Sequence, residues 1–295
     1  MSEGANVNVV DGHLHLFKGV TDSYPREVFE GMTPPDREEL VEDFLKVMDA
    51  AGVDRAVVVP LSKHDRYLGE ILEAHPDRFA GIGVFDFEEN DPVAQIQRRS
   101  DAIGMQGFRF YGLNGEPESD PESLAVFKAM QETQARDLKV WFYGSPDQVA
   151  LLDGVMTLLP DLKVVLNHLG FCPDMWMELT IDEDRRPRFS VPLPPDSIEL
   201  IERLAAKHPN LYVHLSGQYA FTQTPYPHPD LQEVVDRIHN AFGADRMLMA
   251  SDWPWIKQNP GYQEVIALVD HFLPNLSSGE RDAIRGGTAM SLFRF

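Results

Sequence analysis

A strand-then-helix alternation runs through almost the whole chain of 295 residues. Short apolar segments, such as RAVVVPL at 55–61, have the length and composition of buried strands, and amphipathic helical patterns separate them. The expected strands lie at 7–17, 55–61, 79–87, 106–111, 139–143, 163–168, 211–216 and 246–252. The expected helices lie at 37–51, 67–74, 93–103, 121–136, 146–159, 197–207, 231–242, 262–272 and 279–293. This order predicts an α/β fold with a parallel sheet.

Eight such units in this length predict a (β/α)8 barrel that forms one domain over 1–295. The longest irregular segment, 170–195, holds Trp176 and is expected to be a functional loop. A doubly wound open sheet is the alternative fold. No Gly-X-Gly-X-X-Gly turn follows the first strand, which weakens that alternative.

Two histidines, His13 and His15, stand two residues apart in the first expected strand. Side chains at this spacing point to the same face of a strand. Two imidazoles on one buried face are costly without partners. They indicate a metal site or a polar pocket for a substrate carbonyl, and a pair of satisfied core histidines is the plainer alternative.

Further polar residues lie near the ends of the other strands. They are Arg109, Tyr143, His168, His214 and Asp252. In a barrel, the carboxyl ends of all strands meet at one mouth, so we expect these side chains to gather around His13 and His15. For His214, the sequence leaves open whether its side chain faces the barrel interior.

The gathered residues suit hydrolysis of an ester or a lactone, which needs a base for water and donors for the developing oxyanion. Asp252 is the expected base. His13, His15 and His168 would polarise the carbonyl, either directly or through a bound metal ion. A helix N-cap is the alternative role for Asp252.

Three further residues are expected to bind substrate. Arg109 is predicted to hold a substrate carboxylate through its planar guanidinium, with an internal ion pair as the alternative. Tyr143 would donate to a substrate oxygen or would simply pack in the core. His214 is the third candidate.

Ordered motifs along the chain resemble the amidohydrolase superfamily. The main ones are Asp-Gly-His-Leu-His at 11–15, Asn-His-Leu-Gly at 167–170 and Ala-Ser-Asp-Trp-Pro at 250–254. Supporting matches stand at 75–79, 209–213, 216–217 and 286–289. The pattern resembles the amidohydrolase-related (amidohydrolase 2) branch, and within it the group of 2-pyrone-4,6-dicarboxylate lactonases and sugar lactonases.

The resemblance implies a TIM-type barrel and leaves the metal question open. Many members of the superfamily carry a metal-ligating histidine on the fifth strand, where this chain has Tyr143. A zinc or manganese ion would then be held by His13, His15 and Asp252, with His168 as a further aid. The pyrone dicarboxylate lactonases that the pattern resembles work without a metal, so both states are expected alternatives.

The expected function is therefore a hydrolase that opens the lactone of an organic acid. A metal-dependent non-oxidative decarboxylase is the alternative, and the missing fifth-strand histidine counts against it. A non-enzymatic binding protein on a degenerate barrel is a third hypothesis. It is weakened because His13, His15, His168 and Asp252 are all present.

Composition narrows the partners to small molecules. The net charge of −21 argues against nucleic acid and anionic membranes, and no apolar run is long enough to span a bilayer. Residues 1–7 do not look like a signal peptide, and the single cysteine, Cys172, suggests a reducing, cytoplasmic location. The expected substrate is a carboxylated or sugar lactone, and the sequence leaves a homo-oligomer open.

Overall fold

The computed structural model describes residues 8–173 and 178–295, so Trp176 lies outside the described residues. Every expected strand is present, and the third is split at Ile82. The strands are β1 (Val10–Leu14), β2 (Arg55–Val58), β3 (Phe79–Gly81), β4 (Gly83–Val84), β5 (Gly107–Tyr111), β6 (Lys139–Tyr143), β7 (Lys163–Leu166), β10 (Leu211–Leu215) and β11 (Met247–Met249). They pair in parallel in the orders β1-β2-β3 and β4-β5-β6-β7-β10-β11.

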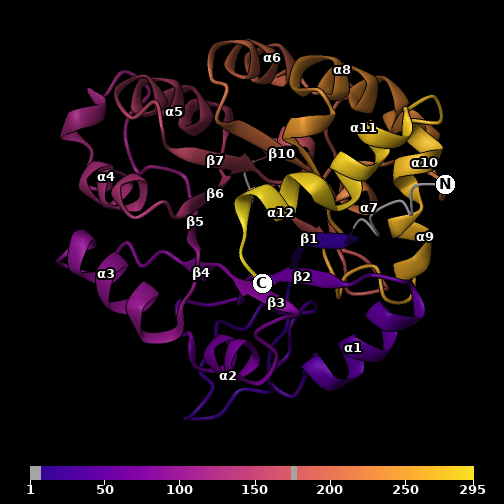
Figure 1. Ribbon diagram of the computed structural model, residues 1–295, viewed down its shortest axis with the longest axis horizontal. Helices are drawn as coiled ribbons and strands as arrows, with labels where there is room; N and C mark the ends of the chain where they lie inside the picture. Colours follow the sequence, from indigo (N-terminus) through magenta and orange to yellow (C-terminus); the bar gives the residue numbers. More distant parts are fainter. Residues whose placement is uncertain (1–7, 174–177) are drawn as a thin grey trace, which may run out of the picture.

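Backbone hydrogen bonds join these two sheets into a closed barrel. At one junction, the Ile82 amide between β3 and β4 donates to the Val58 carbonyl over 3.0 Å. At the other, the Asp252 amide donates to the His13 carbonyl over 2.9 Å, and the His15 amide donates to the Trp253 carbonyl over 2.7 Å. The ring of strands is visible in Figure 1. The predicted (β/α)8 barrel is confirmed.

Helices surround the ring of strands (Figure 1), and the longer ones bury one face against it. They are α1 (Val41–Ala50), α2 (Arg66–Ala74), α3 (Pro92–Ile103), α4 (Phe127–Ala135), α5 (Pro146–Leu158), α6 (Ile198–Lys207), α7 (Gln218–Phe221), α8 (Gln232–Phe242), α9 (Tyr262–Ile266), α10 (Leu268–Phe272), α11 (Ser278–Asp282) and α12 (Thr288–Leu292). In α1, for example, Phe44 and Met48 are spaced by one turn and are fully buried. None of the helices in the described part of the chain is long and apolar enough to cross a membrane.

The expected helix at 121–136 is wrong in its first half. Pro121–Ser123 forms a single 3-10 turn capped by the Asp120 side chain, and α4 begins only at Phe127. Leu124 takes an extended conformation with ψ of 132°, which interrupts the helix. Its side chain is buried there, so packing overrides the helical pattern of the sequence.

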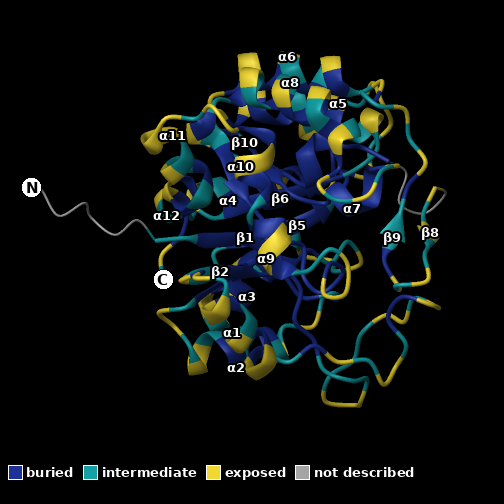
Figure 2. Cartoon of the chain, turned by 90° about the vertical axis from the view of Figure 1, so that its right-hand side faces the viewer, coloured by how far each residue is buried: buried dark blue, intermediate teal, exposed yellow. Residues whose placement is uncertain are grey.

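Two short elements were not expected from the sequence. The helix α7 lies in the segment expected to be a loop after β10. The hairpin of β8 (Thr180–Ile181) and β9 (Pro187–Arg188) lies within the 170–195 loop. Figure 2 places this hairpin on the side of the barrel opposite the carboxyl terminus and α12.

The end of the barrel interior that lies next to α12 is lined by apolar side chains. Val57, Val165 and Leu248 from three different strands pack in one buried cluster with Leu292 and Phe293. This cluster closes the amino-terminal end of the barrel and leaves the carboxyl end for polar residues.

Candidate active site

A cavity of about 480 Å³ opens at the carboxyl ends of the strands. Four of the residues proposed from the sequence line it: Arg109, Tyr143, His168 and Asp252. The side chains of the other three are not on its wall. His13 and His15 contact the Asp252 carboxylate on the side that faces away from the cavity. His214 lies deeper in the barrel, next to His13.

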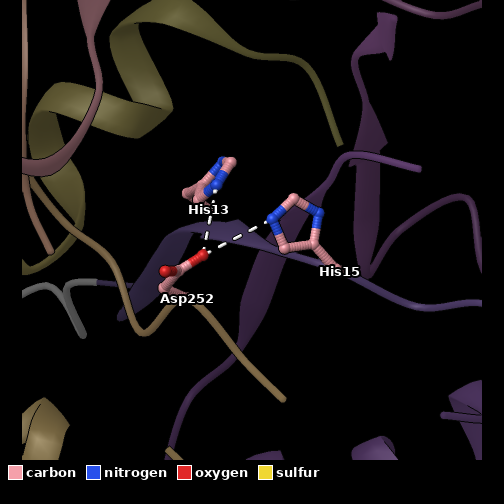
Figure 3. A group of neighbouring side chains, drawn as sticks. All are labelled: His13, His15 and Asp252. Atoms are coloured by element: carbon pink, nitrogen blue, oxygen red, sulfur yellow. Dashed lines mark ion pairs between the residues drawn. The ribbon is translucent and has the colours of Figure 1, made fainter. Parts of the chain in front are cut away.

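Asp252 is placed by the turn that follows β11. Its backbone has a φ of 59°, a left-handed conformation that is uncommon for a residue with a side chain. The carboxylate faces the imidazoles of His13 in β1 and of His15 just after it, with Oδ1 3.5 Å from His13 Nε2 and 3.4 Å from His15 Nε2 (Figure 3). On its other oxygen, Tyr219 donates a hydrogen bond of 2.6 Å to Oδ2. The strained turn is therefore held by contacts on both carboxylate oxygens.

These contacts keep Asp252 ionised. Burial alone would raise the pKa of Asp252, but His168 and the two imidazoles of His13 and His15 outweigh burial and hold this pKa well below its ordinary value. Burial raises the pKa of Tyr219 well above its ordinary value, so its hydroxyl remains a donor at neutral pH.

His168 stands beside Asp252 on the cavity wall. It has a φ of 49° and begins a turn of left-handed residues after β7. Its Nδ1 is 3.0 Å from Ser216 Oγ and 3.9 Å from Asp252 Oδ2, which leaves Nε2 as the ring nitrogen available to a substrate. Burial lowers the pKa of His168 to about 4, so the imidazole is neutral at pH 7.

Gly217 makes room for this imidazole. A Cβ atom at Gly217 would lie 2.8 Å from the ring of His168. The φ of Gly217 is 73°, in the left-handed region that glycine adopts without strain.

Arg109 projects from β5 into the barrel and is 4% exposed. Its guanidinium lies over the Tyr111 ring, 4.6 Å from the centroid, and 5.7 Å from that of Tyr143. Among the described residues no carboxylate forms an ion pair with it, and its buried Nε has no hydrogen-bond partner. The described residues therefore give no support to the alternative of an internal ion pair. A buried cation without a partner is costly, so this side chain is suited to an anionic ligand.

Tyr143 stands at the end of β6, next to Arg109 and His168. Its ring meets the His168 ring edge-on, with centroids 5.5 Å apart. Burial raises the pKa of Tyr143 well above its ordinary value, so the phenol is a hydrogen-bond donor at neutral pH. The position suits a contact to a substrate oxygen.

His13 is supported from below by Trp141. The indole Nε1 of Trp141 donates a hydrogen bond of 3.0 Å to His13 Nδ1. His214 stacks under the His13 ring, with centroids 5.3 Å apart, and is fully buried. His214 has no access to the cavity there, so the structure does not favour its predicted contact with substrate.

Asp11, which was not among the residues expected at the site, joins β1 to the β11 turn. Its carboxylate accepts hydrogen bonds from the Ser251 amide over 2.8 Å and from the Tyr262 hydroxyl over 3.0 Å. Burial raises the pKa of Asp11 to about 6, although these hydrogen bonds oppose the shift. The contacts fix Asp252 relative to His13 and His15 across the closing junction of the barrel.

The group His13, His15 and Asp252 can be judged for its fit to a divalent metal ion. The ligand atoms lie within 4.8 Å of one another, which is close enough for one ion. His15 is suited to bind one, because its Nδ1 is 2.8 Å from the Val59 carbonyl and must donate to it, which leaves a lone pair on Nε2.

His13 does not fit. Burial lowers the pKa of His13 well below its ordinary value, so the ring is neutral. Indole N–H groups only donate, so Nδ1 of His13 must be the unprotonated nitrogen and Nε2 carries the hydrogen. That N–H faces Asp252, where a metal ligand would need a lone pair. The three residues therefore do not form a complete metal site while Trp141 donates to His13.

The family model described as amidohydrolase matches residues 10–295. The chain belongs to the amidohydrolase family. This amidohydrolase is 24% identical to L-fucono-1,5-lactonase of Burkholderia ambifaria over 257 residues, which cover 83% of this chain and 80% of the relative. It is 23% identical to 4-sulfomuconolactone hydrolase of Rhizobium radiobacter over 282 residues, which cover 90% and 84%.

The fold of this amidohydrolase is also shared with solved structures. A crystal structure of a probable 2-pyrone-4,6-dicarboxylic acid hydrolase from Acinetobacter baumannii, with citric acid bound, superposes with a TM-score of 0.73. The two sequences are 18% identical, and the match covers 98% of this chain and 100% of the other. The resemblance inferred from the motifs is thus confirmed at the level of family and fold.

Sequence reasoning missed two residues that touch the site of this amidohydrolase. Tyr219 follows β10 closely, and its position after a strand end was the available signal. Trp141 alternates with Tyr143 along β6, so both face the barrel interior. That spacing could have placed Trp141 below Tyr143, but its contact with His13 depends on the closed barrel.

Proposed function

We propose that this amidohydrolase hydrolyses lactones, with Asp252 as the general base. The observation that carries the proposal is the pair formed by Asp252 and His168 on the cavity wall. It combines an ionised carboxylate with a neutral imidazole, which are the two states that water activation and carbonyl polarisation need. The two curated relatives are both named for lactone hydrolysis.

In the proposed reaction, Asp252 takes a proton from a water molecule as the water oxygen adds to the lactone carbonyl carbon. His168, through Nε2, and the phenol of Tyr143 donate to the developing oxyanion. The bond between the acyl carbon and the ring oxygen then breaks. Asp252 returns the proton to the leaving ring oxygen, and a hydroxy acid or its keto tautomer is released.

His13 and His15 act in this proposal as positioning residues. Both stand behind the Asp252 carboxylate and are away from the cavity wall, so they orient the base rather than touch the substrate. Tyr219 holds the second carboxylate oxygen from the other side. This role replaces the expectation from the sequence that both imidazoles polarise the carbonyl directly.

We propose that the reaction proceeds without a metal ion. The support is the Trp141–His13 hydrogen bond, which places an N–H where the third ligand of a zinc or manganese site would need a lone pair. Decarboxylation is the second candidate, but it depends on a bound metal in the enzymes that the sequence resembles. The same hydrogen bond therefore counts against it.

A cytoplasmic location is proposed from Cys172 alone. The chain has one cysteine and cannot form an internal disulfide. Burial raises the pKa of the Cys172 thiol to about 12, which keeps it protonated.

The experiment that tests the proposed function is a lactone screen at constant pH with purified wild type and Asp252→Asn. Lactone opening releases a proton, whereas decarboxylation releases carbon dioxide. We expect proton release by wild type, and a loss of about 10²–10⁴-fold or more in kcat for Asp252→Asn. Substantial activity in a folded Asp252→Asn protein would remove Asp252 as the base. Release of carbon dioxide would mean that the enzyme is a decarboxylase and that the proposed hydrolysis is wrong.

A further inference from the structure

The wall of the cavity is mainly aromatic and aliphatic. The side chains that form it include Phe29, Met32, Phe85, Phe87, Phe189 and Phe221. Phe189 and Phe221 stack with centroids 5.3 Å apart, and Phe85 and Phe87 meet edge-on at 5.0 Å. A volume of about 480 Å³ lies within the range of pockets that enclose a compact organic ligand. The cavity can therefore bind an apolar part of a substrate next to the reactive groups.

The polar groups gather at the inner end of this cavity. Arg109, Tyr143, His168 and Asp252 lie there, at the ends of the strands. Arg109 is the cation of this group, and its guanidinium has no carboxylate partner among residues 8–173 and 178–295. The inner end can therefore hold one anionic group of a substrate beside the reacting carbonyl.

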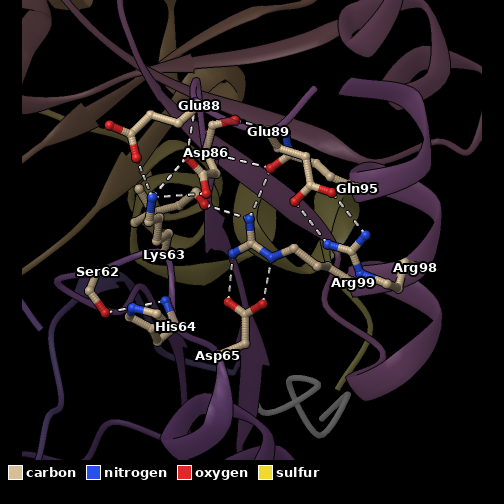
Figure 4. A network of polar contacts seen from close by, with 11 residues as sticks. Ser62, Lys63, His64, Asp65, Asp86, Glu88, Glu89, Gln95, Arg98 and Arg99 are labelled. Carbon is tan, nitrogen blue, oxygen red and sulfur yellow. Dashed lines mark hydrogen bonds and ion pairs between the residues drawn. The ribbon is translucent and has the colours of Figure 1, made fainter. Parts of the chain in front are cut away.

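The outer end of the cavity is acidic. Glu27, Asp86 and Glu88 line it, together with Lys63. Lys63 is already neutralised, because its Nζ lies 3.0 Å from Asp86 and 2.8 Å from Glu88 (Figure 4). A second carboxylate on the substrate would meet this acidic rim, where the described lining residues offer no free cation to bind it.

The phenylalanine-lined part of this wall is poorly suited to a sugar lactone. Each buried hydroxyl without a hydrogen-bond partner costs about 1–3 kcal/mol, and phenylalanine side chains offer no such partner. An aryl or alkyl group, by contrast, gains free energy when it is removed from water into this space.

We infer that the substrate of this amidohydrolase is a lactone with one carboxylate and an apolar aryl or alkyl body, rather than a dicarboxylate or a polyhydroxylated sugar lactone. The inference rests on the proposed lactone hydrolysis. Arg109 binds the carboxylate, and the apolar body lies against Phe87, Phe189 and Phe221. Hydrolysis breaks the bond between the acyl carbon and the ring oxygen, adds water across it and yields a second carboxylic acid.

The test compares three substrates at constant pH. Isocoumarin-3-carboxylate has one carboxylate and a fused benzene ring, 2-pyrone-4,6-dicarboxylate has two carboxylates and no such ring, and D-glucono-1,5-lactone has hydroxyls. We expect kcat/KM to be at least tenfold higher for isocoumarin-3-carboxylate than for either of the others. A higher kcat/KM for the dicarboxylate or the sugar lactone overturns the inference and leaves the proposed lactone hydrolysis intact.

Binding without turnover separates the two proposals. Calorimetric titration with 3-phenylpropionate, isophthalate and D-gluconate should give the tightest binding for 3-phenylpropionate. If 3-phenylpropionate binds best and no lactone is hydrolysed, the proposed function fails, and only the preference of the cavity for one carboxylate and an apolar group stands. If none of the three acids binds and no lactone is hydrolysed, both are overturned.

A charge reversal at the rim tests the reason for the selectivity. The Glu88 side chain is 86% exposed, so Glu88→Lys should fold normally and should add a cation at the outer end. We expect it to raise affinity for isophthalate several-fold without a similar gain for 3-phenylpropionate. Glu73→Lys makes the same charge change at an exposed position of α2, off the cavity wall, and is the matched control. Equal gains in both variants would mean that net charge, rather than the rim, sets the selectivity.

Discussion

Trp141 Nε1 donates to His13 Nδ1 over 3.0 Å, deep inside the barrel. This contact sets the tautomer of His13. The tautomer in turn decides whether His13 Nε2, which faces Asp252, is a hydrogen-bond donor or a possible metal ligand. With the hydrogen on Nε2, His13 presents a donor to a carboxylate rather than a lone pair to a metal ion. The indole of Trp141 in β6 thus determines whether His13, His15 and Asp252 form a metal site or whether the two histidines only position the carboxylate.

Trp141→Phe should therefore increase zinc binding. Without the indole donor, Nδ1 of His13 is free to carry the hydrogen, and Nε2 then offers a lone pair beside His15 and Asp252. After dialysis against zinc and then buffer, we expect near-stoichiometric zinc in Trp141→Phe and little in wild type, measured by elemental mass spectrometry. The loss of the hydrogen bond should destabilise the fold by about 1–3 kcal/mol.

Trp253→Phe is the matched control for this change. Trp253 is also buried, against Phe44 and Tyr262, but its indole Nε1 has no hydrogen-bond partner in the described part of the chain. Its zinc content should remain that of wild type. Equal zinc in wild type and Trp141→Phe would show that Trp141 does not govern metal binding.

Arg109→Met should raise KM for a carboxylated lactone and leave kcat nearly unchanged. Losing a charge-assisted hydrogen bond to the substrate costs about 1.5–3 kcal/mol, which corresponds to roughly 10- to 100-fold in KM. The measurement compares isocoumarin-3-carboxylate with isocoumarin, which lacks the carboxylate. If KM rises equally for both, Arg109 does not bind the carboxylate. Arg66→Met, at an exposed position of α2, controls for the loss of positive charge.

The sequence was sufficient to predict the strands and the barrel because their signals are local. Buried parallel strands appear as apolar runs such as 55–61, and the number and order of the units leave few arrangements. The strand ends then identified Arg109, Tyr143, His168 and Asp252, all of which line one cavity.

How deep each side chain lies inside the barrel could not be predicted from these local patterns. The alternation along the expected strand 7–17 placed His13 and His15 on one face, but it does not say whether that face opens to the cavity or lies on the far side of Asp252. That outcome depends on the turn after β11, where Asp252 takes its left-handed conformation. The contacts of Trp141 and His214 with His13 join residues that are far apart in sequence. They exist only once the barrel has closed.

Acid should weaken the fold through His168. The pKa of this imidazole falls from an ordinary 6.5 to about 4 in the folded chain because of burial. Between these values the unfolded chain binds a proton that the folded chain does not, so stability is full above pH 6.5 and falls as the pH drops towards 4. From pH 7 to pH 5 this amounts to about 2 kcal/mol.

Calorimetry of wild type and His168→Gln at pH 7 and pH 5 checks this expectation. The variant lacks the titrating group, so its Tm should fall less between the two pH values. Asp11 shifts in the opposite sense, because a folded-state pKa raised to about 6 favours the folded chain as the pH falls through 6. Asp11 is present in both proteins, so the difference between them isolates His168. An unchanged pH dependence of Tm in His168→Gln would contradict the assignment.

Gly217→Ala should abolish activity by moving His168. The added Cβ would lie 2.8 Å from the imidazole, which is closer than real Cβ contacts, so His168 must leave its position beside Ser216 and Asp252. Gly104→Ala is the matched control, because Gly104 has a similar φ of 70° and nothing lies within 4 Å of the position that its added methyl group would take. Both variants should lose about 1 kcal/mol from backbone strain. Only Gly217→Ala should also lose kcat, by about 10²-fold or more for a displaced donor. Equal activity in the two variants would mean that the position of His168 does not control turnover.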